Sequence, residues 1–399
     1  NAENPVLAKK VFTDMKDDVV ARNSADIPVI SGATFSSKGF LDAVKDAAKK
    51  AGVTLVKNDK KVVKKVEKAL PKKSTYDVVV IGAGGAGFSA AITAKEKGAN
   101  VVLIEKMPAV GGNSLISGAE MNVAKNWVQP KLGITDDSPE LHAQDTYKGG
   151  DEKGDMKVIN VMTHNALDAA KWCRDDLGVR FEDDNLFFFG GHSRKRALIP
   201  VGHTGTEFIA KFQAKADALG IPVITNMKAE RLIKDKKGRV TGVVASRDGK
   251  NYTFNAKGGV VLATGGFGAN KAMVKKYNPK IDERFMTTDA SGTTGEALYM
   301  AQKAGAELVN MQYIQTYPIC DPISGVIELI ADARFDGAIM LNQEGKRFVE
   351  ELGRRDVLSE AILAQTGSYC WVLWNDNIGK ISNTVKEHAT EYDAFTKQG

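Results

Sequence analysis

The sequence predicts an α/β fold in which a largely parallel sheet is covered by helices on both faces. The segments TYDVVVI, NVVLIEK, IPVITN, VTGVVAS and GGVVLATGG are apolar runs with little polar alternation. Such runs are typical of parallel strands that are buried on both sides. A glycine-rich turn at 82–87 joins the first strand to an alanine-rich helix, and a second buried strand follows. Strand, turn, helix and strand together indicate an α/β core.

The composition is that of an ordinary globular protein. Of 399 residues, 43% are hydrophobic and 26% are charged, which excludes a disordered or fibrous chain. Lysines gather between Lys49 and Lys73, although the formal net charge is only +6. We interpret this stretch as an amphipathic helix and linker rather than a nucleic-acid site, because no aromatic or arginine residues interleave. No apolar run reaches the roughly 18 residues of a membrane span, so stable membrane insertion is not expected.

Cysteine and histidine usage argues against a metal or haem site. The chain has three scattered cysteines and five histidines, without a C-x-x-C-H or H-E-x-x-H motif. We therefore expect no metal. Met107, Met121 and the phenylalanine run at 187–189 are expected to pack in the core.

The turn at 82–87 fits the binding of a dinucleotide. Gly82 allows a tight turn, Gly84 lets a pyrophosphate approach the backbone, and Gly87 lets the helix pack on the strand. The helix N-terminus then faces the phosphates. Glu105 stands 23 residues after Gly82, at the end of the second strand, where it can accept hydrogen bonds from ribose hydroxyls.

Further glycine segments favour FAD over a nicotinamide cofactor. Lys106 leads into G-G-N-S at 111–114, and A-T-G-G-F follows the strand that ends near 262. From about 76 to 362 the chain resembles the FAD domain of the succinate dehydrogenase and fumarate reductase flavoproteins. The resemblance implies non-covalent FAD held by Gly82, Gly84, Gly85, Ala86, Gly87, Glu105, Lys106, Gly112, Asn113, Ser114, Ser117, Gly118, Thr264 and Gly265. A nicotinamide-binding domain is the alternative, although it does not need the second glycine pair.

The N-terminal segment S-G-A-T-F-S-S, at 31–37, resembles the signature of an FMN-binding domain. In that family FMN is attached through a phosphoester to the motif threonine, which is Thr34 here. The resemblance implies covalent FMN at Thr34, a flavin transferase as a partner, and electron flow from FMN to FAD. The alternative is an ordinary helix N-terminus, because Ser36 and Ser37 are good capping residues.

Residues 312–362 resemble the capping domain of flavocytochrome-type fumarate reductases. There N-x-x-G-x-R-F precedes T-R-D-x-x-S-x-A-I, and the matching segments here are 342–348 and 354–362. The resemblance makes Arg355 the residue that delivers a proton to the double bond and Arg334 its relay. A relay is needed because the pKa of arginine exceeds about 12. The alternative for Arg355 is a helical salt bridge with Asp356.

Two departures from the fumarate pattern concern the substrate. Tyr317 replaces a histidine that binds a substrate carboxylate in the family, and Asp332 stands near the place of a Thr-Glu pair. A phenol and an acid favour a substrate whose far end is cationic or an aromatic hydrogen-bond donor. With Arg355, this pattern resembles the members that reduce urocanate to imidazole propionate. His203 and Thr204 lie in a segment that is near flavin and substrate in the family.

Two other functions stay open at this point. One is reduction of fumarate or another acrylate, with Tyr317 and Asp332 in structural roles. The other is a flavinylated electron-transfer protein whose FAD domain passes electrons to a partner.

The predicted organisation is a Rossmann-like FAD-binding domain at 75–311 with an inserted α+β capping domain at 312–399. The C-terminal part of an FMN-binding domain at 1–50 and a Lys-rich helix or linker at 51–74 precede it. Family members continue with a carboxylate clamp and a further FAD motif, so the capping domain is expected to be incomplete and the chain truncated at both ends. By family analogy we expect a bacterial periplasmic protein of anaerobic respiration with a quinol-linked or cytochrome electron donor.

Overall fold

The predicted sheet is present in the computed structural model, which describes residues 11, 15–29, 34–56, 70–320 and 329–375. Its six strands have the order β5-β2-β1-β8-β7-β6. The first four run parallel, whereas β6 and β7 continue from β8 as an antiparallel meander. The strands are β1 (Lys73–Ile81), β2 (Val101–Ile104), β5 (Val223–Ile224), β6 (Lys228–Lys234), β7 (Val240–Arg247) and β8 (Lys250–Leu262).

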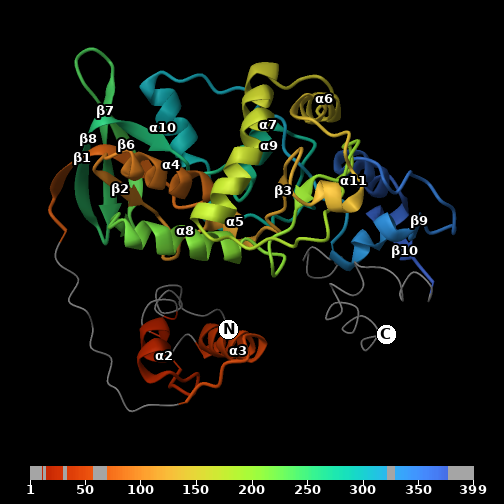
Figure 1. The fold of residues 1–399 in the computed structure, drawn as a ribbon, viewed down its shortest axis with the longest axis horizontal. Helices are drawn as coiled ribbons and strands as arrows, with labels where there is room; N and C mark the ends of the chain where they lie inside the picture. Colours follow the sequence, from red (N-terminus) through yellow and green to blue (C-terminus); the bar gives the residue numbers. More distant parts are fainter. Residues whose placement is uncertain (1–10, 12–14, 30–33, 57–69, 321–328, 376–399) are drawn as a thin grey trace.

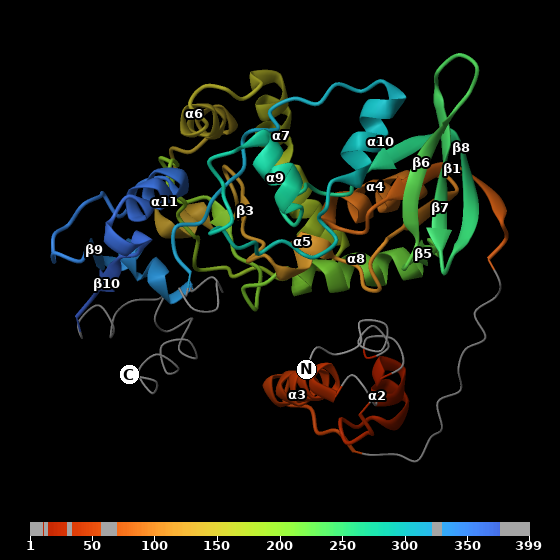
Figure 2. The ribbon, with the colours of Figure 1, turned by 180° about the vertical axis from the view of Figure 1, so that it is seen from behind.

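The two faces of the sheet bury different cores, as expected for unalternated apolar strands. Val80 points to one face and packs with residues of α4 (Gly85–Glu96) and α8 (Thr206–Ala218). Val79 points to the other face and packs with residues of β6, β7 and α10 (Glu296–Ala304). Figure 2 shows α4 and α8 beside the sheet, in which β6, β7 and β8 form the antiparallel meander. The α/β prediction is confirmed.

The larger body is elongated, with the sheet at one end and the C-terminal segment at the other (Figure 1). Between them lies a helical layer that has its own core, including Val123, Ala170 and Leu198. The elements outside the sheet are α5 (Gly112–Ile116), β3 (Met121–Asn122), η2 (Gln129–Leu132), α6 (Pro139–Gly149), α7 (Met156–Lys171), the π-helical η3 (Trp172–Asp176), β4 (Ala197–Leu198) and α9 (Lys271–Tyr277).

The C-terminal segment forms a small unit around Met340, Leu358 and Ile362. Its two strands pair antiparallel, so this part is α+β in character. Its elements are η4 (Leu329–Asp336), β9 (Ile339–Leu341), α11 (Arg355–Leu363), η5 (Thr366–Ser368) and β10 (Trp371–Leu373).

Residues near the N-terminus form a separate helical unit with a small core that includes Met15, Ile27 and Leu41. Its helices are α2 (Lys16–Arg22) and α3 (Thr34–Lys50). The loop residues 30–33 and the lysine-rich stretch 57–69 lie outside the described residues, so the helix expected in that stretch stays a prediction.

The packing of α4 on the sheet depends on Gly87. A Cβ atom added at Gly87 would lie 1.7 Å from the carbonyl oxygen of Gly82. No rotamer change can relieve an overlap with backbone, so Gly87→Ala should lower the free energy of unfolding by about 3 kcal/mol. Urea unfolding followed by tryptophan fluorescence measures this.

The matched control for Gly87→Ala is Gly259→Ala on β8. A Cβ there meets nothing within 4 Å, and its change should stay within about 0.5 kcal/mol. Equal stability of the two variants would contradict the role given to Gly87.

Candidate active site

The three glycine segments singled out in the sequence line one cavity at the carboxyl ends of β1, β2 and β8. Its volume is about 350 Å³. The predicted residues that line it are Gly82, Gly84, Gly85, Ala86, Glu105, Lys106, Gly112, Asn113, Ser114, Thr264 and Gly265. Gly87 packs beneath the turn, while Ser117 and Gly118 follow α5 outside the lining.

The turn at the cavity is built by close backbone contacts. Gly82 has φ +103°, and a Cβ there would lie 2.3 Å from the carbonyl oxygen of Ala263. Only glycine can adopt this positive φ readily and also leave room for the nearby carbonyl oxygen. The first amides of α4 therefore face the cavity, and that of Gly85 donates to Ser114 Oγ at 3.1 Å.

Glu105 is held at the end of β2 by two backbone amides. Its Oε2 accepts from Ala83 at 2.9 Å, and its Oε1 accepts from Met107 at 2.8 Å. An ionised carboxylate has about four acceptor sites, so oxygen lone pairs stay available for ribose hydroxyls. A helix start, a turn without side chains and an oriented acid together fit a dinucleotide.

An ion pair that the sequence analysis missed forms part of the cavity wall. Lys106 Nζ lies 2.6 Å from Thr294 Oγ1 and 3.0 Å from Glu296 Oε2. Burial alone would raise the pKa of Glu296, but hydrogen bonds from Thr294 and Lys106 outweigh it and lower the pKa to about 2. The available signal was the T-T-G-E segment, in which Gly295 has φ +79° and precedes α10.

Asn113 joins two walls of the cavity. Its amide nitrogen donates to Asp289, and its Oδ1 accepts from the backbone of Ala290 at 2.6 Å. These partners lie 176 and 177 residues further along the chain. Polar contacts between distant segments therefore hold this part of the cavity wall together.

A second cluster forms around Arg355, the first residue of α11. Its guanidinium carbon lies 5.1 Å from the ring centroid of Tyr317 and 6.0 Å from that of Phe189. At these distances a cation is attracted to the ring faces. The structure thus brings together Arg355 and Tyr317, two residues of the substrate pattern that the sequence analysis had singled out.

Aromatic rings connect this cluster to Arg334. The ring centroids of Phe189 and Phe187 are 4.7 Å apart, and those of Phe187 and Phe335 are 6.1 Å apart. The guanidinium of Arg334 is 4.6 Å from the Phe335 ring, and this arginine is only 3% exposed.

The expectation that the phenylalanine run packs in the core was wrong. Phe188 is 39% exposed, and Phe187 and Phe189 are half-buried, with Phe189 near Arg355. Three successive aromatic residues do not reveal which rings a loop turns inward. Met107 and Met121 are also only partly buried, with Met107 in the cavity wall.

Other predicted residues take different places. His203, at φ +53°, pairs through Nε2 with Glu182 at 2.8 Å, and Thr204 beside it is exposed. Their loop contacts the cavity segment, because the amide of Gly205 donates to Ser117 O at 2.8 Å. Asp332 belongs to η4, but its side chain lies outside the described part of the structure. The side chain of Thr34, the first residue of α3, is also outside it.

The salt bridge considered as an alternative for Arg355 is formed by its neighbour. Asp356 accepts from Arg354 Nε at 3.1 Å and from Arg354 Nη2 at 2.8 Å. Arg355 is instead directed at the two rings.

Comparison with known proteins identifies the family. Residues 77–397 match the family model of an FAD binding domain, and residues 1–49 match that of an FMN-binding domain. The chain belongs to the FAD-binding family. It is 42% identical to the urocanate reductase of Eggerthella lenta, over 99% of this chain and 67% of that protein. It is 38% identical to a cytochrome fumarate reductase of Shewanella frigidimarina, over 82% of this chain and 57% of that protein.

The fold comparison agrees with this assignment. The open conformation of a flavocytochrome c3 fumarate reductase is similar with a TM-score of 0.69 and 33% identity, over 80% of this chain and 56% of that one. The predicted FAD-binding fold with an FMN-binding domain before it is confirmed, as is the predicted similarity to urocanate and fumarate reductases. The chain spans about two thirds or less of the length of these relatives.

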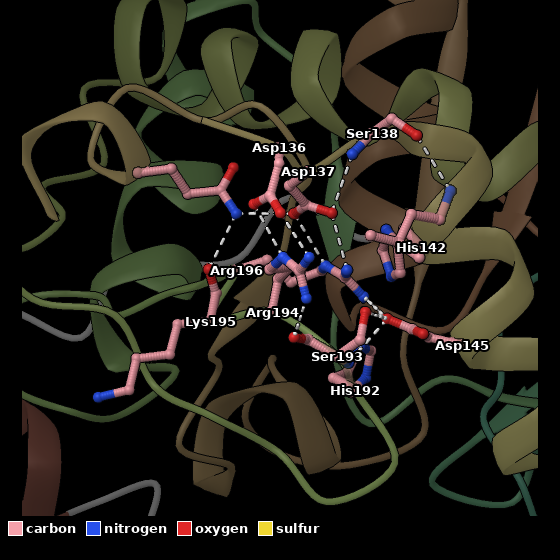
Figure 3. A network of polar contacts seen from close by, with 12 residues as sticks. Asp136, Asp137, Ser138, His142, Asp145, His192, Ser193, Arg194, Lys195 and Arg196 are labelled. Carbon is pink, nitrogen blue, oxygen red and sulfur yellow. Dashed lines mark hydrogen bonds and ion pairs between the residues drawn. The ribbon is translucent and has the colours of Figure 1, made fainter. Parts of the chain in front are cut away.

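A buried network of charged side chains holds the segment that follows Phe189 in place. Figure 3 shows Asp137 and Asp145 gathered around Arg196. Arg196 is fully buried and donates to both oxygens of Asp137, at 3.0 and 2.8 Å, and to Asp145 at 2.7 Å. Asp145 also accepts from the backbone of Ser193 at 2.9 Å, which ties the segment to α6.

Two histidines complete this network in their neutral forms. His192 Nδ1 lies 2.8 Å from Arg196 Nη1, and it must accept because arginine only donates. Burial and the charge of Arg196 lower the pKa of His192, and the same causes with His192 lower that of His142 to about 4.

The network makes stability depend on pH. Unfolding returns His142 to an ordinary pKa near 6.5, so the unfolded chain binds more protons below that value and stability falls as the pH drops toward 4. Between pH 7 and pH 5 this histidine should account for a loss of about 2 kcal/mol. Urea unfolding of wild type and His142→Leu at both pH values measures the difference.

The control is His164→Leu, which removes an exposed histidine of α7. It should keep the wild-type pH dependence, while His142→Leu should flatten it. A His142→Leu variant with the full wild-type loss would contradict the assignment.

Proposed function

We propose that this chain is the flavin-binding part of a reductase for an α,β-unsaturated carboxylate, with urocanate as substrate and imidazole propionate as product. The observation that carries the proposal is the Arg355 guanidinium at the start of α11, directed at the rings of Tyr317 and Phe189. The 42% identity to a urocanate reductase supports it.

The cofactor and Arg355 would divide the reaction between them. Residues of the cavity such as Gly82, Gly84 and Glu105 would hold FAD, which would supply the hydride needed at the β-carbon. Arg355 gives a proton to the α-carbon, so two electrons and two hydrogens convert the double bond to a single bond. Because the pKa of arginine exceeds about 12, the proton must be replaced at once, and the buried Arg334 is the proposed relay.

Residues around Arg355 would select the substrate. The Tyr317 ring and Phe189 offer aromatic faces to a planar ring, and the Tyr317 phenol can hydrogen-bond to an imidazole nitrogen. A carboxylate from Asp332 would favour the imidazolium form of that ring. His203 and Thr204 are proposed to border the substrate from the loop that contacts Ser117.

Reduction of fumarate or another acrylate is the second candidate. The 38% identity to a cytochrome fumarate reductase favours it. The same roles of FAD and Arg355 would serve, so the two candidates differ only in the residues that meet the far end of the substrate.

The setting of the enzyme is also part of the proposal. We propose a bacterial periplasmic protein of anaerobic respiration that takes electrons from a quinol-linked or cytochrome donor. FMN, covalently attached at Thr34 by a flavin transferase, would pass them to FAD. In the described part of the chain, no helix is both long and apolar enough to cross a bilayer. No group of metal-binding side chains occurs there either.

Attachment of FMN is tested by mass. When the protein is produced together with a flavin transferase, its denatured mass should exceed that of the polypeptide by one FMN. Thr34→Ala should lose this increment and keep FAD, because the phosphoester needs the hydroxyl. The control is Thr54→Ala, in the same N-terminal unit, which should keep the increment. An unchanged mass in Thr34→Ala would place the attachment elsewhere.

Substrate choice is tested by kinetics of the flavin-loaded full-length protein with a reduced viologen donor. Loss of a charge-assisted hydrogen bond costs roughly 1.5–3 kcal/mol, so Asp332→Ala should lower kcat/KM for urocanate about tenfold to a hundredfold. Arg355→Ala should abolish turnover and leave binding measurable, since a proton donor acts in the transition state.

The matched control is Glu344→Ala, an exposed acid of the same C-terminal segment, which should behave as wild type. Faster reduction of fumarate than of urocanate by wild type would overturn the substrate assignment. So would unchanged urocanate kinetics in Asp332→Ala.

A further inference from the structure

Phe189, whose ring lies near Arg355, begins a tight turn that ends at His192. The amide of His192 donates to the carbonyl oxygen of Phe189 at 3.3 Å. Gly191, the third residue of this turn, has φ +87°, a value that glycine adopts readily and that is typical of type II turns at this position. Because Gly190 and Gly191 have no side chains to pack, the place of the Phe189 ring depends on what holds the two ends of the turn.

The two ends of the turn are held in different ways. Before it, the amide of Phe187 donates to the carbonyl oxygen of Ala197, the first residue of β4, at 3.0 Å. After it, Asp145 Oδ2 accepts from the amide and the hydroxyl of Ser193, at 2.9 and 2.8 Å, and from Arg196 at 2.7 Å (Figure 3). Three donors thus converge on one carboxylate oxygen of α6.

The carboxyl group of Asp145 stays ionised in this place. Burial alone would raise its pKa, but hydrogen bonds from Ser193 and Arg196 outweigh burial and lower the pKa. Hydrogen bonds to an ionised acceptor are roughly twice as strong as those between neutral groups. Asp145 therefore gives Ser193, the residue directly after the turn, a strong and directional anchor.

The same face of α6 also carries the turn itself. Asp145 and Gly149 are four residues apart on the helix, so they lie on one face. A Cβ at Gly191 would lie 3.8 Å from the Gly149 Cα, and one at Gly190 would lie 3.5 Å from the carbonyl oxygen of Leu352. The turn therefore lies between the end of α6 and the residues that lead into α11.

We propose that Asp145 is a positioning residue that holds Ser193 and thereby fixes the turn 189–192 and the Phe189 ring near Arg355. This inference rests on the proposed function, in which Phe189 offers an aromatic face to the ring of the substrate. Asp145 acts only through the turn and takes no part in proton transfer.

The first test is the kinetics of the flavin-loaded full-length protein with urocanate and a reduced viologen. Asp145→Ala removes the acceptor of Ser193, and kcat/KM should fall about tenfold. Asp145→Asn keeps an oxygen at the same place and should stay within about threefold of wild type. Arg196 keeps both oxygens of Asp137 in either variant, so the buried guanidinium remains paired. A wild-type kcat/KM in Asp145→Ala would overturn the inference.

A double-mutant cycle distinguishes positioning of Phe189 from general damage to the fold. Phe189→Leu should by itself lower kcat/KM for urocanate. In that background Asp145→Ala should lower it less than about twofold further, because the ring through which it acts is gone. A further tenfold fall would show an effect independent of the ring and would overturn the inference, as would an unchanged kcat/KM in Phe189→Leu.

A milder variant covers the case in which Asp145→Ala does not fold. Ser193→Ala removes only the hydroxyl bond and leaves the Asp145–Arg196 pair in place. It should lower kcat/KM about threefold, and this fall should also vanish in the Phe189→Leu background. A fall that persists there would contradict the positioning role, and so would the absence of any fall.

The matched control is Glu140→Ala. Glu140 is an exposed acid in the first turn of the same helix, and it pairs with His164 of α7 at 3.1 Å rather than with the segment that follows Phe189. This variant should keep the wild-type kcat/KM. A loss equal to that of Asp145→Ala would show that any acid of α6 has the same effect and would overturn the inference.

A measurement without turnover separates this inference from the proposed function. With para-fluorophenylalanine at position 189, the fluorine resonance should move in Asp145→Ala and keep its wild-type position in Glu140→Ala. If wild type reduces no unsaturated acid but the resonance moves as described, the proposed function fails and the positioning of the ring stands. If the resonance does not move in Asp145→Ala, the positioning role fails regardless of activity.

Discussion

Backbone contact between the glycine turn and the end of β8 is the constraint on which the rest of the structure depends. Side chains at Gly82 or Gly87 would overlap carbonyl oxygens of Ala263 or of Gly82 itself. Without those side chains, β1, α4 and β8 approach closely enough for two glycine segments to share one cavity. This close approach also positions the N-terminus of α4, Glu105 at the end of β2, and the polar wall from α10.

Charge is distributed according to burial. In the helical layer, Arg196 is fully buried and both of its carboxylate partners are satisfied. Such a pair is costly to break, because the remaining charge would be buried alone. The ion pairs of Arg354 are partly exposed, with 34% of its side chain accessible, so they add little to stability.

The proposed chemistry needs two regions that different parts of the chain supply. The FAD cavity belongs to the sheet, whereas Arg355 and Tyr317 belong to the C-terminal segment at the far end of the body (Figure 1). The segment from Phe187 to Arg196 joins the C-terminal segment to the helical layer, because its Phe189 ring lies near Arg355 and its charged end is fixed to α6. Substrate specificity would then depend on how this segment and α11 face each other.

The sequence by itself determined the α/β core, the turn at 82–87, the role of Glu105 as the acid at the end of β2, and the family. These features are local: apolar runs, glycine spacing and motif order act over a few tens of residues. Only the tertiary structure decided that Lys106 meets Glu296, that Asn113 meets Asp289, and that Phe187–Phe189 lie half-buried or exposed.

The ion pair of Asp356 shows why the sequence alone does not determine such contacts. Arg355 directly precedes Asp356 and Arg354 stands one position earlier. Helical spacing alone does not determine which of the two arginines pairs with this acid. In the structure Arg354 also pairs with Asp151, and Arg355 lies near the Phe189 ring, and both of these partners stand more than 160 residues earlier in the chain. Contacts of that range carry no periodic signal, so they are set by tertiary packing.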